Sequence, residues 1–187
     1  MFTKKAKVLK RQIVFDKHKR LVEERLRVSD GSELGWAYLD MPRSVIVAAL
    51  TDDKKLLVEK LYRYNLKEFT YELPAGSFDL EEGPVAAAQR ELLEETEYTA
   101  KEFIDLGKYF VLPSETNRWT HYFLALGAAQ KEESQLDNLI EKYFEISFDL
   151  MDFEEVAQKI GTKDSPIKGV ESGFGIYLVR KYLYENS

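Results

Sequence analysis

Apolar and polar positions alternate along the start of the chain, and this pattern predicts β-structure there. The expected strands are Val8 to Phe15, Val22 to Val28 and, after a turn at Asp30-Gly31, Leu34 to Leu39. Three short strands with so few apolar side chains are only marginally stable alone. We therefore expect an antiparallel arm, residues 1–41, that packs on the rest of the chain, residues 42–187, or on a second subunit.

The next stretch, Ser44 to Leu50, is continuously apolar apart from its first residue, which is typical of a strand buried on both faces. Asp52-Asp53 predicts a hairpin turn into a second strand. Further strands are expected at Lys55 to Leu61, Glu102 to Leu112, Arg118 to Gly127 and Tyr143 to Phe148.

Helical periodicity appears in three places. Ala86, Ala87 and Ala88 favour a helix from Val85 onward, and Pro84 suits its first turn. Two more helices are expected near the end of the chain, at Phe153 to Ile160 and Val170 to Tyr184, the latter with a mixed packing face of Phe174, Tyr177, Leu178, Lys181 and Tyr182. Mixed strands and helices of this kind indicate an α/β (α+β) fold.

Composition narrows the function classes. The chain has 187 residues and is 44% hydrophobic, enough for one substantial core. It has no cysteine and only two histidines, which excludes thiolate metal sites and a multi-histidine zinc site. The N-terminus lacks an apolar signal core, and no apolar run is long enough for a membrane span. We expect a cytoplasmic protein without a membrane partner.

Charge is unevenly distributed. The net charge is −6, but residues 1–28 are rich in lysine and arginine. Such a basic arm could contact nucleic acid, attract a phosphorylated small molecule, or form the polar side of the strands. Aromatic residues do not interleave with these charges, so nucleic acid is the least favoured of these partners.

Three carboxylates are expected on one face of the first helix. Glu91, Glu94 and Glu95 fall at i, i+3 and i+4, where like charges destabilise a helix unless a cation lies between them. Carboxylate and carbonyl oxygens suit Mg²⁺, Mn²⁺ or Ca²⁺. Arg90 lies four residues before Glu94, close enough to hold it, and the turn at Pro74-Ala75-Gly76 should bring carbonyl oxygens to the head of the helix. The plain alternative is a solvated acidic helix.

The complete pattern resembles the signature of the Nudix hydrolases. Gly76 is followed after five residues by Glu82, then after seven by Arg90-Glu91-Leu92, and then by Glu94-Glu95 and Glu97-Tyr98. One position departs from the family pattern, because Glu97 occupies the place of a glycine that normally lets the chain leave the helix at positive φ. We therefore expect a different helix exit and an intact metal face. The resemblance covers roughly residues 43–160 and implies the Nudix fold, a mixed sheet sandwiched between helices.

Within that family, the segment LLVEKLYRYNLKEFTYELPAG resembles ADP-ribose pyrophosphatases and related nucleoside-diphosphate-sugar hydrolases. Pro113, fifteen residues after Tyr98, resembles a proline marker of that subgroup, although Ser114 and Arg118 differ from it. By this resemblance Arg63 would reach the substrate phosphates, and Glu72 would face the site. Trp36 and Tyr38 would either present aromatic rings to a base or serve as packing.

The resemblance implies Mg²⁺-dependent hydrolysis of a pyrophosphate bond, with Mn²⁺ as a substitute, in a homodimer. ADP-ribose is the leading substrate, and the products are a nucleoside monophosphate and a sugar phosphate. Two alternatives stay open: another substrate, such as GDP-mannose or a dinucleotide coenzyme, and a non-catalytic nucleotide-sugar sensor.

The site residues follow from the same comparison. The candidate metal ligands are Ala75, through its carbonyl, Glu91, Glu94 and Glu95, and the candidate catalytic residues are Glu94, Arg90 and Glu141, with Asp137 and Glu133 as other choices for the loop base. The candidate substrate-binding residues are Arg63, Glu72, Trp36, Tyr38, Arg43, Ser77 and Pro113.

Overall fold

A computed structural model describes residues 6–17, 19–131 and 146–186. Internal contacts divide the chain into two compact units, which are described here one at a time. The first comprises residues 1–43 and 110–119, and the second comprises residues 44–109 and 120–187.

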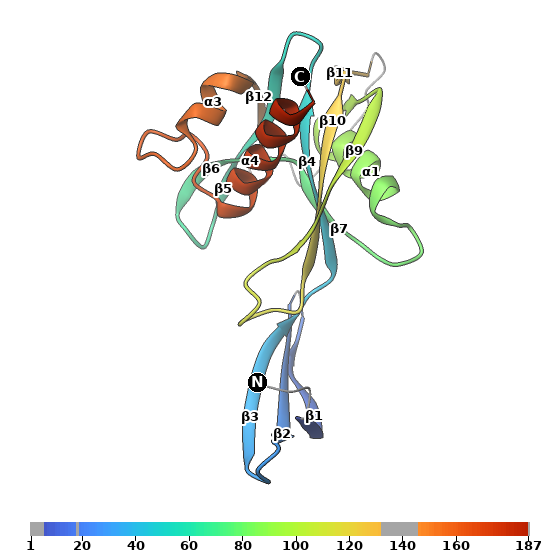
Figure 1. Cartoon of the computed structure of the whole chain (residues 1–187), viewed down its shortest axis with the longest axis vertical. Coiled ribbons are helices and arrows are strands. Elements are labelled where there is room, and N and C mark those ends of the chain that lie inside the picture. The colour runs from blue at the N-terminus through green and yellow to red at the C-terminus, as the bar shows by residue number, and fades with distance from the viewer. Residues whose placement is uncertain (1–5, 18, 132–145, 187) are drawn as a thin grey trace. The chain divides into compact units, whose positions relative to one another are not determined.

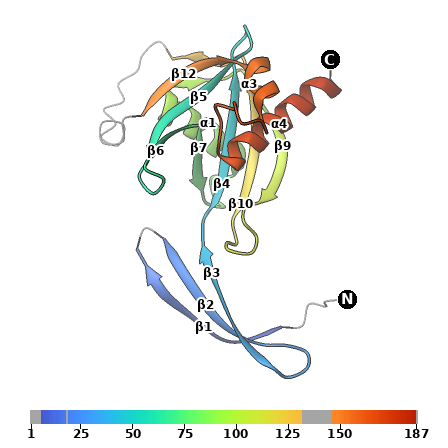
Figure 2. The same cartoon turned by 90° about the vertical axis from the view of Figure 1, so that its left-hand side faces the viewer.

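The first unit is built on an antiparallel sheet of β1 (Lys7–Asp16), β2 (Arg20–Arg27) and β3 (Glu33–Asp40), in that order (Figure 2). The three strands predicted for the arm are therefore present. Val22 is the only fully buried side chain among them. The segment 110–119 is tied to the end of β3, because the Leu39 N–H donates to the Glu115 carbonyl at 2.8 Å and the Met41 N–H to Asn117 Oδ1 at 2.9 Å.

The second unit contains a mixed seven-stranded sheet (Figure 1). Its main path runs β12 (Ser147–Asp152), β5 (Lys55–Arg63), β4 (Arg43–Leu50), β10 (Trp119–Leu126) and β9 (Glu102–Phe110). β4 and β10 are parallel, whereas β5 is antiparallel to both β4 and β12. Two short strands complete the sheet, β6 (Glu68–Glu72) beside β5 and β7 (Ala75–Phe78) beside β4, and a separate pair joins β8 (Tyr98–Thr99) to β11 (Ala129–Gln130).

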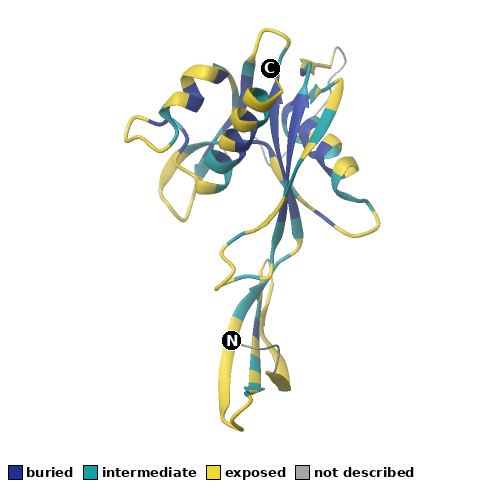
Figure 3. Ribbon diagram, in the orientation of Figure 1, coloured by how far each residue is buried: buried dark blue, intermediate teal, exposed yellow. Residues whose placement is uncertain are grey.

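β4 is buried from Ser44 to Leu50 (Figure 3), and its alternate residues belong to two separate cores. Ile46, Ala48 and Leu50 pack with α3 (Phe153–Lys159) and α4 (Val170–Glu185), whereas Val45, Val47 and Ala49 pack with α1 (Pro84–Thr96). A strand between two helical layers must be apolar on both faces, which explains the continuous run from Val45. The predicted mixed sheet between helices is confirmed.

The strand predicted at Tyr143 to Phe148 lies partly outside the described residues; β12 is described from Ser147, where it pairs with Lys60 of β5. The packing face predicted for α4 is confirmed for Phe174, Leu178 and Tyr182, which lie in the core or pack against it. It was wrong for Tyr177, which is 55% exposed, and for Lys181, which is also exposed. α4 packs closely on the core at Gly175, where a Cβ would lie 2.9 Å from the Leu73 side chain.

The expected change at the exit of α1 was also wrong. Glu97 has φ 62° and ψ 12°, the left-handed conformation that a glycine would adopt, and its N–H donates to the Leu93 carbonyl at 2.9 Å. The C-cap thus keeps the geometry of the glycine and tolerates a side chain in a region that disfavours one.

Replacing this residue by glycine should therefore stabilise the protein. We expect Glu97→Gly to raise the free energy of unfolding by about 1 kcal/mol, because it removes the Cβ penalty at positive φ. Urea denaturation measures the change. Glu97→Ala, which keeps the Cβ, is the matched control and should show no such gain; a glycine variant less stable than the alanine variant would contradict the explanation.

None of the helices within the described residues is both long and apolar enough to cross a membrane.

Candidate active site

The candidate metal ligands lie where β7 begins beside the second half of α1. The Ala75 N–H donates to Glu95 Oε2 at 2.9 Å, which fixes one oxygen of that carboxylate. Burial raises the pKa of Glu95 to about 7, although the Ala75 N–H opposes the shift. The turn at Pro74-Ala75-Gly76 therefore meets the middle and end of the helix, not its head as the sequence suggested.

Gly76 leaves the space in which the Glu91 carboxylate lies. A Cβ built on Gly76 would lie 1.8 Å from the Glu91 carboxyl carbon and 2.0 and 2.1 Å from its oxygens. Glu91 itself is only 8% exposed. Burial raises the pKa of Glu91, and Arg90 opposes that shift. Only glycine at position 76 permits a carboxylate to come so close to the backbone of β7.

Arg90 links the acids of the helix to the loop before it. Its guanidinium donates to Glu82 at 2.6 and 3.1 Å, to Glu94 at 2.8 Å and to the Ser77 carbonyl at 3.1 Å, and it lies 2.8 Å from Glu91. The predicted contact with Glu94 is confirmed. These carboxylates, Glu82 foremost, raise the pKa of Arg90, which therefore remains a cation.

Arg63 and Glu72 form the second part of the site. Arg63 ends β5, and its Nε and Nη2 donate to the two Glu72 oxygens at 2.8 and 2.5 Å. Burial would raise the pKa of Glu72, but hydrogen bonds from Arg63 and Thr70 lower it below its usual value. The Arg63 side chain remains 45% exposed, so donors not used by Glu72 are accessible.

Four of the predicted residues belong to the first unit or its boundary. Trp36 and Tyr38 lie two apart on β3, with Trp36 49% exposed and the Tyr38 hydroxyl 3.4 Å from Glu24. Pro113 lies in the exposed segment between β9 and β10, and Arg43 begins β4. The three candidates for the loop base, Glu141, Asp137 and Glu133, lie outside the described residues.

The sequence matches the family profile described as NUDIX domain over residues 40–168. The chain belongs to the Nudix family. It is 32% identical over 128 residues to "ADP-ribose pyrophosphatase" of Bacillus subtilis (strain 168), a match that covers 68% of this chain and 69% of that protein. It is also 32% identical over 93 residues to "Methanol dehydrogenase activator" of Bacillus methanolicus, over 50% of each chain.

The structure is similar to a solved one titled "Crystal structure of ADP compounds hydrolase", with a TM-score of 0.80 and 18% sequence identity over 98% of this chain and 97% of that one. This likeness shows the Nudix fold. Together with the family match and the ADP-ribose pyrophosphatase relative, it makes the chain a Nudix pyrophosphohydrolase of the ADP-ribose pyrophosphatase type.

The oxygen-rich donor set of this Nudix hydrolase fits a hard divalent ion. Glu91 and Glu95 lie beside the backbone of Ala75 and Gly76, and carboxylate and carbonyl oxygens are the ligands that Mg²⁺ and Mn²⁺ prefer. Within the described part of the chain no three acids already converge as a finished metal cluster, because Arg90 and the Ala75 N–H hold these side chains instead.

Two acids that were not named as site residues also bear on this part of the molecule. Glu82 is the first partner of Arg90, and its place in the Nudix signature could have indicated this. Glu59 is buried on β5, and burial, together with the charge of Glu95, raises its pKa well above the usual value. A lone glutamate within the apolar run Leu56-Leu57-Val58 was the signal for it.

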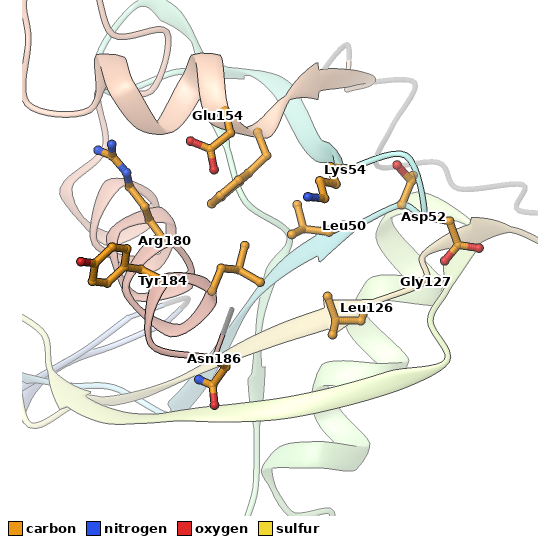
Figure 4. A pocket seen from close by; sticks show the side chains of 12 residues that line it. Leu50, Asp52, Lys54, Leu126, Gly127, Glu154, Arg180, Tyr184 and Asn186 are labelled. Carbon is orange, nitrogen blue, oxygen red and sulfur yellow. The ribbon is translucent and has the colours of Figure 1, made fainter.

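A separate hollow of about 700 Å³ lies at the ends of β4 and β10, lined in part by Leu50, Lys54, Leu126, Phe153 and Arg180 (Figure 4). None of the residues that line it is a candidate metal ligand, so we do not assign the Nudix chemistry to it.

Proposed function

We propose that this Nudix hydrolase cleaves the pyrophosphate bond of a nucleoside diphosphate sugar, with ADP-ribose as the leading substrate, to give a nucleoside monophosphate and a sugar phosphate. One observation carries the proposal: Arg63, which can bind phosphate, is held by Glu72, and only three residues further along the chain the Ala75 N–H holds Glu95, a candidate metal ligand. A diphosphate needs both a metal-binding acid and a guanidinium within reach. The similarity to an ADP-ribose pyrophosphatase favours ADP-ribose.

The chain's own residues supply binding and orientation. Glu91 and Glu95 would hold Mg²⁺, or Mn²⁺ in its place, with the Ala75 carbonyl and Glu94 as further ligands. When bound, such an ion neutralises phosphate charge and lowers the pKa of a coordinated water. Glu72 holds one edge of the Arg63 fork, which leaves Nη1 for a phosphate oxygen. Arg90 orients Glu94, and Glu141 is the proposed general base.

A substrate panel tests the proposal. ADP-ribose, GDP-mannose, NADH and nucleoside triphosphates are incubated with the protein and Mg²⁺, with and without excess EDTA, and the phosphate-containing products are identified. ADP-ribose should show the highest kcat/KM, and EDTA should abolish turnover. Turnover of none of these compounds would overturn the proposal, whereas preference for another one would reassign the substrate.

Removing the Arg63 guanidinium should impair substrate binding more than it lowers kcat. We expect Arg63→Ala to raise KM for the best substrate roughly tenfold or more, because a hydrogen bond to a charged group contributes about 1.5–3 kcal/mol. Arg63→Lys should recover only part of this, since an ammonium cannot replace the planar fork. Steady-state kinetics measure both values.

Arg180→Ala, on the exposed side of α4, is the matched control and should leave KM unchanged. An unchanged KM in Arg63→Ala would remove Arg63 from the substrate site.

We also propose a homodimer formed through the arm. Several large apolar side chains of the arm are exposed, including Val8, Ile13, Val14, Phe15 and Trp36. A second copy of the arm would cover such a surface. Light scattering should give twice the chain mass of 21.7 kDa, and Ile13→Lys should reduce it to a single chain; a wild-type protein of single-chain mass at high concentration would contradict the dimer.

A further inference from the structure

The carboxylate that holds Arg63 has a second hydrogen-bond donor on its own strand. The Thr70 hydroxyl donates to Glu72 Oε1 at 2.7 Å, and the same oxygen accepts from Arg63 Nε at 2.8 Å. Arg63 Nη2 donates to the other Glu72 oxygen at 2.5 Å. Thr70 and Glu72 lie two apart on β6, so their side chains are on the same face of the strand. The hydroxyl therefore holds the carboxylate where the Arg63 guanidinium meets it.

A different carboxylate is nearer to Arg63 in the strand pairing. Glu68 is directly opposite Arg63 in the antiparallel ladder of β5 and β6, whereas Thr70 is opposite Leu61. Directly opposite residues are the nearest cross-strand neighbours on one face, and opposite charges at such positions attract each other. Arg63 nevertheless makes its ion pair with Glu72. The register alone would favour Glu68, so another contact must direct the guanidinium to Glu72.

The backbone beside Glu72 is fixed independently of Thr70. The next N–H along the chain, that of Leu73, donates to the buried Ser172 Oγ of α4 at 3.0 Å. The side chain of Glu72 is less confined, because 23% of it is exposed. The orientation of its carboxylate therefore depends on the two groups that donate to it, Arg63 and Thr70.

The choice between the two acids decides where the guanidinium points. Glu68 begins β6, next to the turn that joins this strand to β5. Glu72 ends β6, three residues before Ala75, whose N–H holds the candidate metal ligand Glu95 at 2.9 Å. Pairing with Glu72 directs Arg63 toward the end of β6 that leads to the candidate metal ligands, whereas pairing with Glu68 would direct it to the turn.

We propose that Thr70 is a positioning residue for phosphate binding: its hydroxyl holds the Glu72 carboxylate so that the Arg63 guanidinium pairs with Glu72 and not with Glu68. The inference rests on the proposed function, in which Arg63 binds a phosphate of the substrate. Thr70 contacts no substrate in this role and acts only through Glu72 and Arg63.

Two substitutions separate the hydroxyl from the rest of the side chain. Thr70→Val keeps the shape and removes the donor, whereas Thr70→Ser keeps the donor and removes a methyl group. We expect Thr70→Val to raise KM for the best substrate about threefold or more and to change kcat by less than about twofold, because the guanidinium loses its place while the metal ligands keep theirs. Thr70→Ser should resemble the wild type. Thr99→Val, at the exposed position of β8, is the matched control and should change neither value.

A double-mutant cycle distinguishes positioning from packing. If Thr70 acts through Arg63, adding Thr70→Val to Arg63→Ala should raise KM no further, whereas a packing defect would act in both backgrounds. Adding Glu68→Gln to Thr70→Val should lower KM again, because it removes the competing charge; no recovery would overturn the selection between the two acids. If Thr70→Val does not fold, Thr70→Ala provides the same comparison with Thr70→Ser.

Calorimetric titration with inorganic pyrophosphate and Mg²⁺ repeats the comparison without turnover. Thr70→Val should bind pyrophosphate more weakly than the wild type, and Thr70→Ser should not. Equal weakening in both variants would assign the effect to packing and overturn the role of the hydroxyl.

The remaining outcomes separate this role from the proposed function. Binding that Arg63→Ala weakens and Thr70→Val leaves unchanged would overturn the role of Thr70 and leave the proposed function intact. Binding that is absent from the wild type, or unchanged in Arg63→Ala, would overturn the phosphate-binding role of Arg63 and this inference together.

Discussion

Glu95→Gln should reduce hydrolysis on the order of 100-fold or more, because removing a metal ligand costs at least as much as removing a residue that supports one. Glutamine keeps the length of the side chain, but it lacks the negative charge that a divalent ion requires. Burial already raises the pKa of Glu95 to about 7, so the protein accommodates a neutral group there without metal. The variant should therefore remain folded, with an unfolding temperature no lower than that of the wild type.

Steady-state kinetics over a range of Mg²⁺ concentrations, with thermal unfolding in EDTA, measure both effects. Glu81→Gln is the matched control, since Glu81 is exposed and lies outside the acidic face of α1. Activity of Glu95→Gln within about threefold of the wild type would exclude Glu95 as a ligand.

The second large effect is expected from Gly76→Ala. The added Cβ would lie 1.8 Å from the Glu91 carboxyl carbon, so either β7 or the Glu91 side chain must move. Because Glu91 is itself a candidate metal ligand, we expect Mn²⁺ binding to weaken by about tenfold or more, and hydrolysis to fall with it.

A glycine-to-alanine change elsewhere provides the comparison. Gly169 has no atom within 4 Å of a built Cβ and no positive φ, so Gly169→Ala should bind Mn²⁺ and hydrolyse substrate like the wild type. Normal Mn²⁺ affinity in Gly76→Ala would show that Glu91 does not need its present place for metal binding.

Local patterns in the sequence were sufficient for most of the fold. The apolar run from Val45 to Leu50 predicted a strand covered on both faces, and Pro84 marked the first position of α1. These signals are carried by consecutive residues.

The helix exit at Glu97 shows where propensity fails. A side chain at φ 62° is unfavourable locally, yet the C-cap hydrogen bond to Leu93 and the pairing of Tyr98 with Gln130 require the chain to turn there. Tertiary structure sets this conformation, and the sequence alone predicted the opposite.

The residue types of the candidate site were predictable from the sequence, but most contacts between those residues were not. The spacing of Arg90 and Glu94 predicted their ion pair, because it depends only on one helix. The pairing of Arg63 with Glu72 depends on the register between β5 and β6. Such contacts arise from sheet pairing, which no local pattern specifies.

Arg90 contacts both the loop before α1 and the acids on the helix, so a single mutation there affects both. The same guanidinium anchors the loop at Glu82 and Ser77 and orients the helix acids Glu91 and Glu94. Any replacement at this position alters loop conformation and ligand geometry at once. A change at Arg90 is therefore expected to shift the loop at Ser77 and Glu82 and the helix acids together.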